Sequence, residues 1–263
     1  MMTKTICWLL LIAALGGAIA LYFWSETDKQ PPSVLEAPAA PEKPSIRHPI
    51  EAARSLPAPP VLADKPLPEL ADSDGAIREM LEKLFAGNLE QYFNLQKIVH
   101  RFVATVDNLP RETAPLQLMP VKPVPGWTAT EGKSETLALS PKNSTRYKSY
   151  IRLAESVPTG LLVAAYVRFY PLFQEQYERL GYPGKYFNDR LMEVIDHLLA
   201  APEVVGPVLL TQTHVLYQFT DPSLERLSAG QKILIRMGSD NAVKVKAKLR
   251  EIRDAFTPKK TKG

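Results

Sequence analysis

Residues 159–180 read TGLLVAAYVRFYPLFQEQYERL, and this stretch decides the fold class. Aromatic side chains recur in it at spacings of four, three and four, namely Tyr166, Tyr170, Phe173 and Tyr177. Such spacing places them on one face of an α-helix, as a helix with one buried side requires. Pro171 falls inside the segment and should kink or break the helix, because proline removes a main-chain donor. Gly181 and Pro183 should end it.

Further helices are predicted on both sides of this segment. Capping residues, apolar residues at helical spacing and terminating Gly or Pro residues delimit them. The predicted ranges are 73–86, 88–108, a helix that opens at Ser140-Pro141, 188–200, 228–237 and 239–256. Ser73 and Asp74 can cap the first of these, and Ser228 with Gln231 forms a capping box for the fifth.

Strand signals are fewer. Residues 208–219 are the best strand candidate because they are rich in Val, Leu, Thr, Tyr and Phe. Residues 127–130 and 136–139 can form a small hairpin. The Pro-punctuated arm 109–140 holds Met119, Val121, Val124 and Trp127, so we expect it to pack across the helices. The sequence therefore predicts a single, mainly α domain over residues 72–256 with a minor β element.

An uncharged apolar run, ICWLLLIAALGGAIALYFW at residues 6–24, precedes this domain. Nineteen residues are about enough to cross a bilayer as one helix, and the aromatic residues at its far end favour a membrane interface. A signal peptide cleaved after Ala20 is the alternative. Small residues four apart, such as Ala13 and Gly17, would let two such helices dimerise; the alternative is that they only reflect how common Gly and Ala are in membrane helices. The short basic leader 1–5 predicts a cytoplasmic N-terminus at a bacterial inner membrane and a periplasmic C-terminal domain.

Residues 25–71 contain eleven prolines and predict a disordered, semi-rigid tether. The only cysteine, Cys7, lies in the apolar run, which excludes disulfides and thiolate metal sites within the folded domain.

Positive charge gathers at the C-terminal end. Residues 232–263 contain ten Lys or Arg residues and only three acidic ones, and the tail 257–263 is basic. Two helices around Gly238 superficially suggest a helix-turn-helix DNA reader, but an export signal argues against a nucleic-acid partner. Attraction to anionic lipid or to an anionic cell-wall polymer is one interpretation. A solvated helix face with a basic tail is the other.

Few residues suggest chemistry. Asp189, Glu193 and His197 share one helix face at a spacing that metal-binding helices use. They lie opposite the apolar stripe of that helix, so we expect Glu193 and His197 to form a solvent-exposed pair and predict no metal and no cofactor. Neither a nucleophile elbow nor a Gly-rich phosphate loop is present in the sequence, and we assign no catalytic residue.

The aromatic segment offers a ligand site as an alternative to simple core packing. Tyrosine hydroxyls in a buried stripe need polar partners, and several polar side chains are close in sequence. The candidate ligand-binding residues are Arg168, Tyr170, Gln174 and Tyr177.

Four phrases in the chain are distinctive in combination: VATVDNLPR at 103–111, RFYPLFQ at 168–174, LGYP at 180–183 and LSAGQK at 227–232. With the anchor and the Pro-rich tether, they resemble the uncharacterised proteobacterial family known as domain of unknown function 3014. The resemblance implies a bacterial, membrane-anchored protein and no known activity. We expect a periplasmic binding or scaffolding protein of the cell envelope, which would contact the bilayer through residues 6–24 and an envelope protein or cell-wall polymer through its domain. An envelope hydrolase or transferase is the alternative.

Overall fold

The computed structural model describes residues 45–53, 66–85, 89–212 and 216–257. The chain divides into two units, residues 1–43 and 44–263, and every described residue belongs to the second. The apolar run 6–24 lies outside the described residues, so the membrane anchor stays a prediction. Within the described ranges, none of the helices combines the length and apolar character that a membrane crossing needs.

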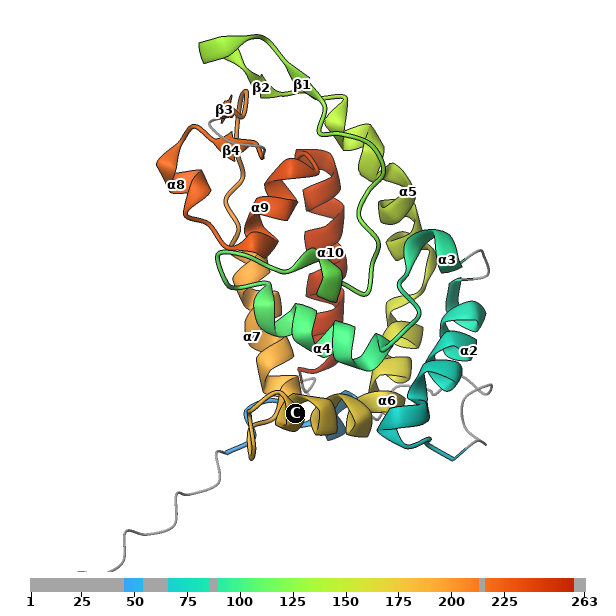
Figure 1. The fold of residues 1–263 in the computed structure, drawn as a ribbon. Helices are drawn as coiled ribbons and strands as arrows, with labels where there is room; N and C mark the ends of the chain where they lie inside the picture. Colours follow the sequence, from blue (N-terminus) through green and yellow to red (C-terminus); the bar gives the residue numbers. More distant parts are fainter. Residues whose placement is uncertain (1–44, 54–65, 86–88, 213–215, 258–263) are drawn as a thin grey trace, which may run out of the picture. The chain divides into compact units, whose positions relative to one another are not determined.

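The described unit is mainly helical, as the sequence predicts (Figure 1). The α-helices are α2 (Ser73–Phe85), α3 (Leu89–Tyr92), α4 (Ile98–Asn108), α5 (Asn143–Ser156), α6 (Thr159–Arg179), α7 (Phe187–Leu199), α8 (Pro222–Glu225), α9 (Ala229–Arg236) and α10 (Ser239–Ala255). Short 3-10 turns are η1 (Ile50–Ala53), η3 (Leu70–Asp72), η4 (Leu116–Leu118) and η5 (Ser134–Thr136). The strands are β1 (Thr130–Glu131), β2 (Ala138–Leu139), β3 (Leu210–Thr211) and β4 (Gln218–Phe219).

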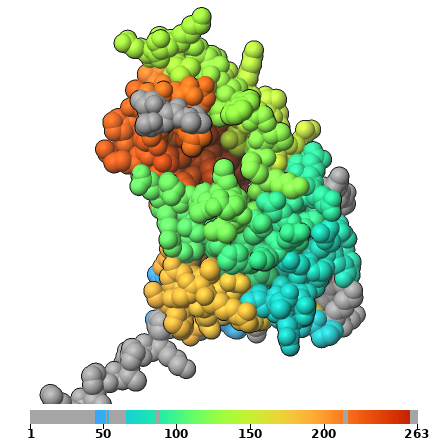
Figure 2. Space-filling model, in the orientation of Figure 1, coloured from blue at the N-terminus to red at the C-terminus, as the bar shows by residue number. Residues whose placement is uncertain are grey.

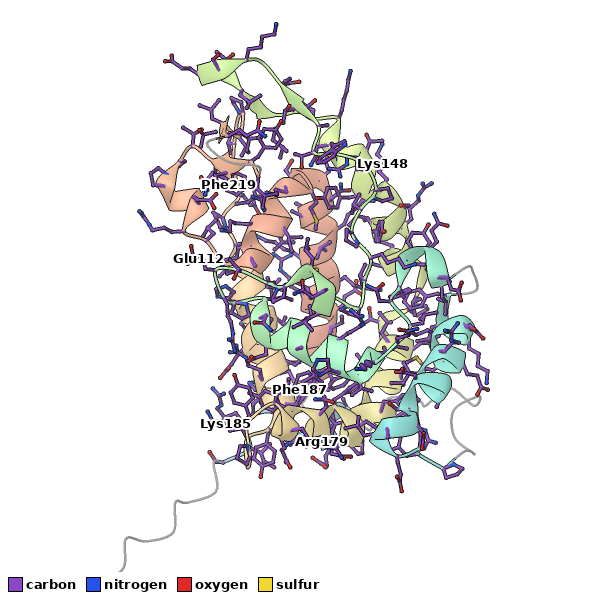
Figure 3. The ribbon with its side chains drawn as sticks, in the orientation of Figure 1. Glu112, Lys148, Arg179, Lys185, Phe187 and Phe219 are labelled. Atoms are coloured by element: carbon purple, nitrogen blue, oxygen red, sulfur yellow. The ribbon has the colours of Figure 1, made fainter. Side chains whose placement is uncertain are left out.

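The core forms where α6 packs against α4, α7 and α10. Its predicted aromatic face is buried, with Phe173 and Tyr177 only 7% and 4% exposed. Phe187 is fully buried beside them, and in Figure 3 it lies among the helices whereas Arg179 and Lys185 project outward. Helix α6 is continuous through the exposed Pro171 and bends along its length in Figure 1, so the proline does not break it.

The predicted helix 88–108 is wrong as a single element, because α3 and α4 are separated by residues 93–97. Asn94 interrupts the helix: its main-chain N–H donates to Pro120 O at 2.8 Å and its side-chain amide to Met119 O at 2.9 Å. The carboxylate of Asp74 then accepts the N–H groups of Lys97 and Ile98, at 2.6 and 2.9 Å. Asp74 therefore caps α4, a different helix from the one it was expected to cap.

The arm between α4 and α5 packs across the helices as predicted. Thr105 on α4 donates its hydroxyl to Leu118 O at 3.1 Å, and Arg101 bonds to the carbonyls of Gln117 and Met119. Trp127 is an exception within the arm, since it is 93% exposed.

Two short hairpins make up the β element. β1 pairs antiparallel with β2 in the predicted region, with Thr130 opposite Leu139. The predicted strand 208–219 is wrong as one strand: β3 and β4 pair with each other, with Leu210 opposite Phe219. An antiparallel bridge between Ala138 and Leu209 joins the hairpins. In Figure 2 these two segments cover one end of the described unit.

Part of the predicted tether belongs to the folded unit. Ile50 and Ala53 are 7% and 1% exposed and pack in a cluster with Val163 of α6 and Met192 of α7. Burial of these two apolar side chains requires the adjoining main chain to follow the surface of the helices. The packed region thus begins before residue 72. Residues 45–53 were predicted to belong to a disordered tether, but they pack against the helices instead.

Candidate functional site

A small polar pocket of about 370 Å³ lies at the C-terminal end of α4, beside the turn between α6 and α7. Asp107, one of the residues that line it, is 5% exposed. The Asp107 carboxylate accepts the hydroxyl of Tyr182 at 3.1 Å and forms ion pairs with Arg111 and Arg190. Arg190 also donates to the main-chain carbonyl of Asp107 at 2.9 Å. Two buried carboxylates, those of Asp107 and Asp189, therefore line the pocket.

Glu193 of this pocket also forms ion pairs with arginines. Glu193 pairs with Arg47 and, at 3.5 Å, with Arg190. Partial burial favours the neutral acid, but the hydrogen bonds and charges of Arg47 and Arg190 outweigh it and lower the pKa of Glu193 below its ordinary value. Arg190 Nε lies 3.2 Å from Asp107 Oδ1 in an orientation that makes an ion pair without a hydrogen bond. Such internal pairing is typical of a structural network.

The four predicted ligand-binding residues do not form one groove. Tyr177 lines the polar pocket and stacks on Tyr182 with ring centroids 4.5 Å apart. Tyr170 donates its hydroxyl to Gln174 at 3.0 Å, and Gln174 in turn bonds to main-chain groups of Lys185 and Phe187, at 2.7 and 2.8 Å. Burial raises the pKa of Tyr170 and of Tyr177 to about 12. The tyrosines therefore behave as core residues, and Gln174 fixes the turn into α7.

Arg168, the fourth of these residues, is half-buried on α6. It lines neither the polar pocket nor the larger cleft described below.

The predicted pair of Glu193 and His197 is not formed. His197 Nε2 lies 2.8 Å from the hydroxyl of Ser228, whereas Glu193 pairs with arginines. Asp189, 7% exposed, accepts the main-chain N–H groups of Arg47 and His48, at 3.2 and 2.7 Å. All three residues of the considered metal face thus bind protein groups.

Ser228 and His197 lie at the separation that a nucleophile and its general base require. Ser228, however, is 6% exposed, and its hydroxyl also accepts the N–H of Gln231 at 3.2 Å. The N–H groups of Ala229 and Gly230 donate to main-chain carbonyls, at 2.7 and 2.9 Å, and so face no substrate. The pair is a helix cap. Only half of the predicted capping box is present: Ser228 accepts the N–H of Gln231, but the Gln231 side chain donates to His197 O at 3.0 Å and does not accept the main-chain N–H of Ser228.

Three of the four distinctive sequence phrases meet at this junction. The turn after α4 receives the first N–H groups of α9, while Tyr182 contacts Asp107 at its other side. A Cβ on Gly230 would stand 2.5 Å from Leu198 Cδ2 and 3.2 Å from Leu109 O, so only glycine fits without a shift. The residues of these phrases therefore pack and hydrogen-bond the helices together at one junction.

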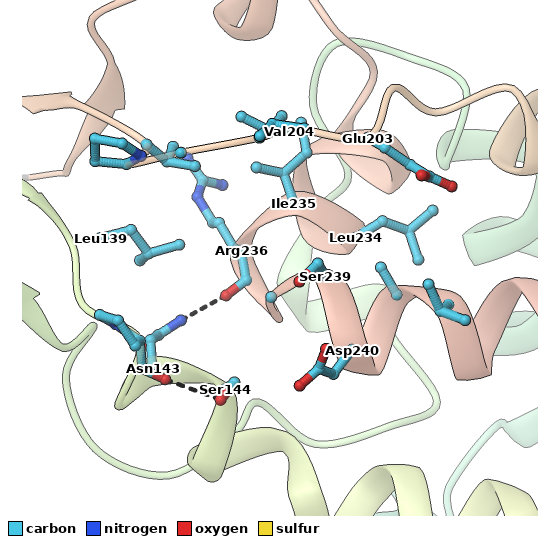
Figure 4. A pocket seen from close by; sticks show the side chains of 18 of the residues that line it. Leu139, Asn143, Ser144, Glu203, Val204, Leu234, Ile235, Arg236, Ser239 and Asp240 are labelled. Atoms are coloured by element: carbon cyan, nitrogen blue, oxygen red, sulfur yellow. Dashed lines mark hydrogen bonds between the residues drawn. The ribbon is translucent and has the colours of Figure 1, made fainter.

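A larger cleft, of about 680 Å³, lies between residues 202–208, the hairpins and the turn joining α9 to α10. Its walls are mostly apolar, and Figure 4 shows Leu139, Val204, Leu234 and Ile235 around it. Asn143 closes one side by donating its amide to Arg236 O at 2.5 Å. A cavity of this size and lining is typical of ligand sites.

Both cations that line the cleft are engaged with main-chain carbonyls. Lys246 is 5% exposed and donates to Ala201 O at 2.6 Å. Arg236 lies 5.0 Å above the ring of Phe219 and donates to Tyr217 O at 3.3 Å. The basic face expected on α10 is thus partly used inside the domain.

The cleft escaped sequence reasoning because its walls come from residues between 131 and 246. One local signal was present: two adjacent valines, Val204 and Val205, in a short segment between Pro202 and Pro207, directly after a helix.

A family model described as "Protein of unknown function (DUF3014)" matches residues 98–253, which contain every residue that lines the larger cleft. A search of curated proteins gave no match, and neither did a search of solved structures.

Proposed function

This chain belongs to the DUF3014 family, and we propose that it is a membrane-anchored binding or scaffolding protein of the bacterial cell envelope. In this proposal residues 6–24 hold it in the inner membrane, and the helical unit lies in the periplasm. The cleft of about 680 Å³ is the surface that takes a partner.

The cleft carries this proposal. It combines apolar walls with a polar rim, and this combination favours binding over chemistry. Val205 and Val243, at 98% and 53% exposed, line it as apolar side chains left open to solvent. An apolar surface of this kind gains free energy when a partner covers it.

The alternative, an envelope hydrolase or transferase, has less support. It needs a nucleophile or an acid–base pair open to a cleft. In the polar pocket Asp107 and Glu193 are ion-paired with arginines and Asp189 accepts main-chain N–H groups, and the Ser228–His197 pair serves as a cap. An anionic cell-wall polymer is also less favoured as a partner, because Lys246 is buried on Ala201 O and Arg253 is paired with Asp196 at the surface.

The sequence supplies the placement in this proposal. The described unit begins at Ser45, so the stand-off from the membrane would run over residues 25–44. As a polyproline II segment these residues would span roughly 60 Å. The cleft could then reach partners at some distance from the bilayer.

Site-specific photocrosslinking in living bacteria tests the binding role. A benzophenone amino acid at Val205 or at Val243 should give crosslinked species that are absent when it replaces Leu116, an apolar residue 60% exposed outside the cleft. The same pattern at all three positions would contradict a partner specific to the cleft.

Fusions at the C-terminus test the placement. An exported phosphatase should be active there and a fluorescent protein that matures only in the cytoplasm should be dark. The opposite result would overturn the periplasmic location and leave the crosslinking result to be judged by itself.

A further inference from the structure

We infer that the cleft binds an extended peptide segment of another envelope protein, apolar in its centre and with Lys or Arg at its ends. This inference rests on the proposed function. It adds the chemical class of the partner and the mode of binding, which is main-chain pairing along residues 203–205.

The main chain of one cleft wall supports peptide binding. Within the described residues, no hydrogen bond involves the main-chain N–H or C=O groups of Glu203, Val204 or Val205. The pairing of the hairpins stops at Val208, whose carbonyl accepts the N–H of Leu139 at 2.9 Å. Unpaired main-chain groups beside an apolar groove are what an added strand uses. A lipid chain could not use them.

The side chains of the cleft fit an apolar centre in the partner. Val205 is 98% exposed, and Leu139, Ile235 and Val243 line the same cleft. Alternate side chains of an extended peptide point to opposite faces. Every second residue of a bound segment would therefore enter the groove, while the residues between them stay in solvent.

The rim charges indicate basic ends. Glu131, Glu203 and Asp240 are exposed, and none of them has an ion-pair partner among the described residues. The lining cations Arg236 and Lys246 are already engaged with carbonyls. In Figure 4 Glu203 and Asp240 stand at different edges of the cleft. The free charge of the rim is negative at more than one edge, which complements a segment with a cation at each end.

Binding of synthetic peptides to the full chain in detergent micelles tests this inference. The probe is a fluorescein-labelled pool of capped heptapeptides with Lys ends and Val, Ile, Leu or Thr at the central positions. Two matched pools carry Glu ends, or N-methyl groups on alternate central residues. We expect each to bind about tenfold more weakly, through charge repulsion and through lost main-chain hydrogen bonds respectively.

Variants of the protein locate the site. Glu203→Gln combined with Asp240→Asn should weaken the Lys-ended pool about threefold to tenfold at low salt and much less at high salt. Glu82→Gln combined with Glu112→Gln, exposed acids outside the cleft, should leave binding unchanged. Hydrogen exchange at the amides of residues 203–205 should slow when the Lys-ended pool is added.

Three results would overturn the inference: equal affinity for Lys-ended and Glu-ended pools, equal affinity for the N-methylated pool, or no binding of any pool. Cleft-specific crosslinks in cells together with one of these results would retain the binding role and remove the peptide mode. Absence of such crosslinks would count against the binding role itself.

Discussion

Replacing Asp107 by Asn should destabilise the folded unit through the charge it leaves behind. Asp107 is 5% exposed and lies 3.2 Å from Arg190 Nε, while the Arg190 side chain is 25% exposed. Removing one partner of a fully buried ion pair costs about 3–5 kcal/mol, because the other charge stays buried without compensation. Water reaches part of Arg190 and Glu193 stays 3.5 Å from it as a second partner, so we expect a smaller loss, of about 2–3 kcal/mol. Asn keeps the volume of Asp and therefore adds no cavity.

The assay is urea and thermal unfolding of the full chain in detergent at pH 7, followed by far-ultraviolet circular dichroism. The melting temperature should fall by roughly 5–10 °C, given the usual slope for a domain of this size. Asp196→Asn is the matched control, since Asp196 pairs with Arg253 at 3.0 Å but is 55% exposed. It should cost less than about 1 kcal/mol.

A second substitution separates the charge from other effects of the change. Adding Arg190→Met to Asp107→Asn removes the cation that has lost its closer carboxylate partner, so the double variant should be at least about 1 kcal/mol more stable than additivity predicts. If Asp107→Asn unfolds like Asp196→Asn, or if the two changes simply add, the reasoning from buried charge is refuted.

Three further outcomes follow from the packing, the capping and the tyrosines. Gly230→Ala should lower the free energy of unfolding by about 1–3 kcal/mol, because its Cβ would meet Leu198 Cδ2 at 2.5 Å. Gly75→Ala, which has open space around its Cβ, should instead raise it by about 0.5–1 kcal/mol by favouring helix α2. Urea unfolding of both variants checks these opposite signs. Asp74→Ala should cost about 1 kcal/mol, with faster hydrogen exchange at the start of α4, and unchanged exchange there would contradict the cap across helices. Burial raises the pKa of Tyr177 to about 12 in the folded protein, above the value of about 10 expected in the unfolded chain. The stabilising contribution of the neutral hydroxyl should therefore be fully present below about pH 10 and be lost between about pH 10 and 12. Tyr177→Phe should make the decline of stability in this alkaline range shallower.

Local signals in the sequence predicted the helices well where the helix ends are themselves local. The aromatic spacing of 159–180 and the terminators Gly181 and Pro183 give α6 its face and its end, and Gly181 takes a positive φ of 101° as a terminating glycine does. The hairpin β1–β2 also followed from its sequence. In these segments the residues that fix the main chain are neighbours along it.

Predictions failed where a distant residue made the deciding bond. Asn94 leaves the helix because the arm at residues 119–120 offers it two carbonyls, and Asp74 caps α4 instead of α2. Residues 208–219 have the composition of one strand, but pairing of β3 with β4 turned them into a hairpin. Of the candidate ligand residues, Tyr170 donates its hydroxyl to the Gln174 side chain, so both are hydrogen-bonded within the protein.

The sequence by itself determined that this protein is mainly helical, that four phrases mark one family and that an apolar run and a Pro-rich stretch precede the domain. Periodicity and composition carry that information because they act over a few residues. Only the tertiary structure decided which charged side chains are hydrogen-bonded inside the domain and which remain unpaired at its surface. Lys246 looked like part of a solvated basic face but is buried and donates to Ala201 O, whereas Glu203 and Asp240 are exposed at a cleft whose walls come from residues far apart in the sequence. Burial and pairing depend on what the rest of the chain brings alongside, and that is a property of the packed helices.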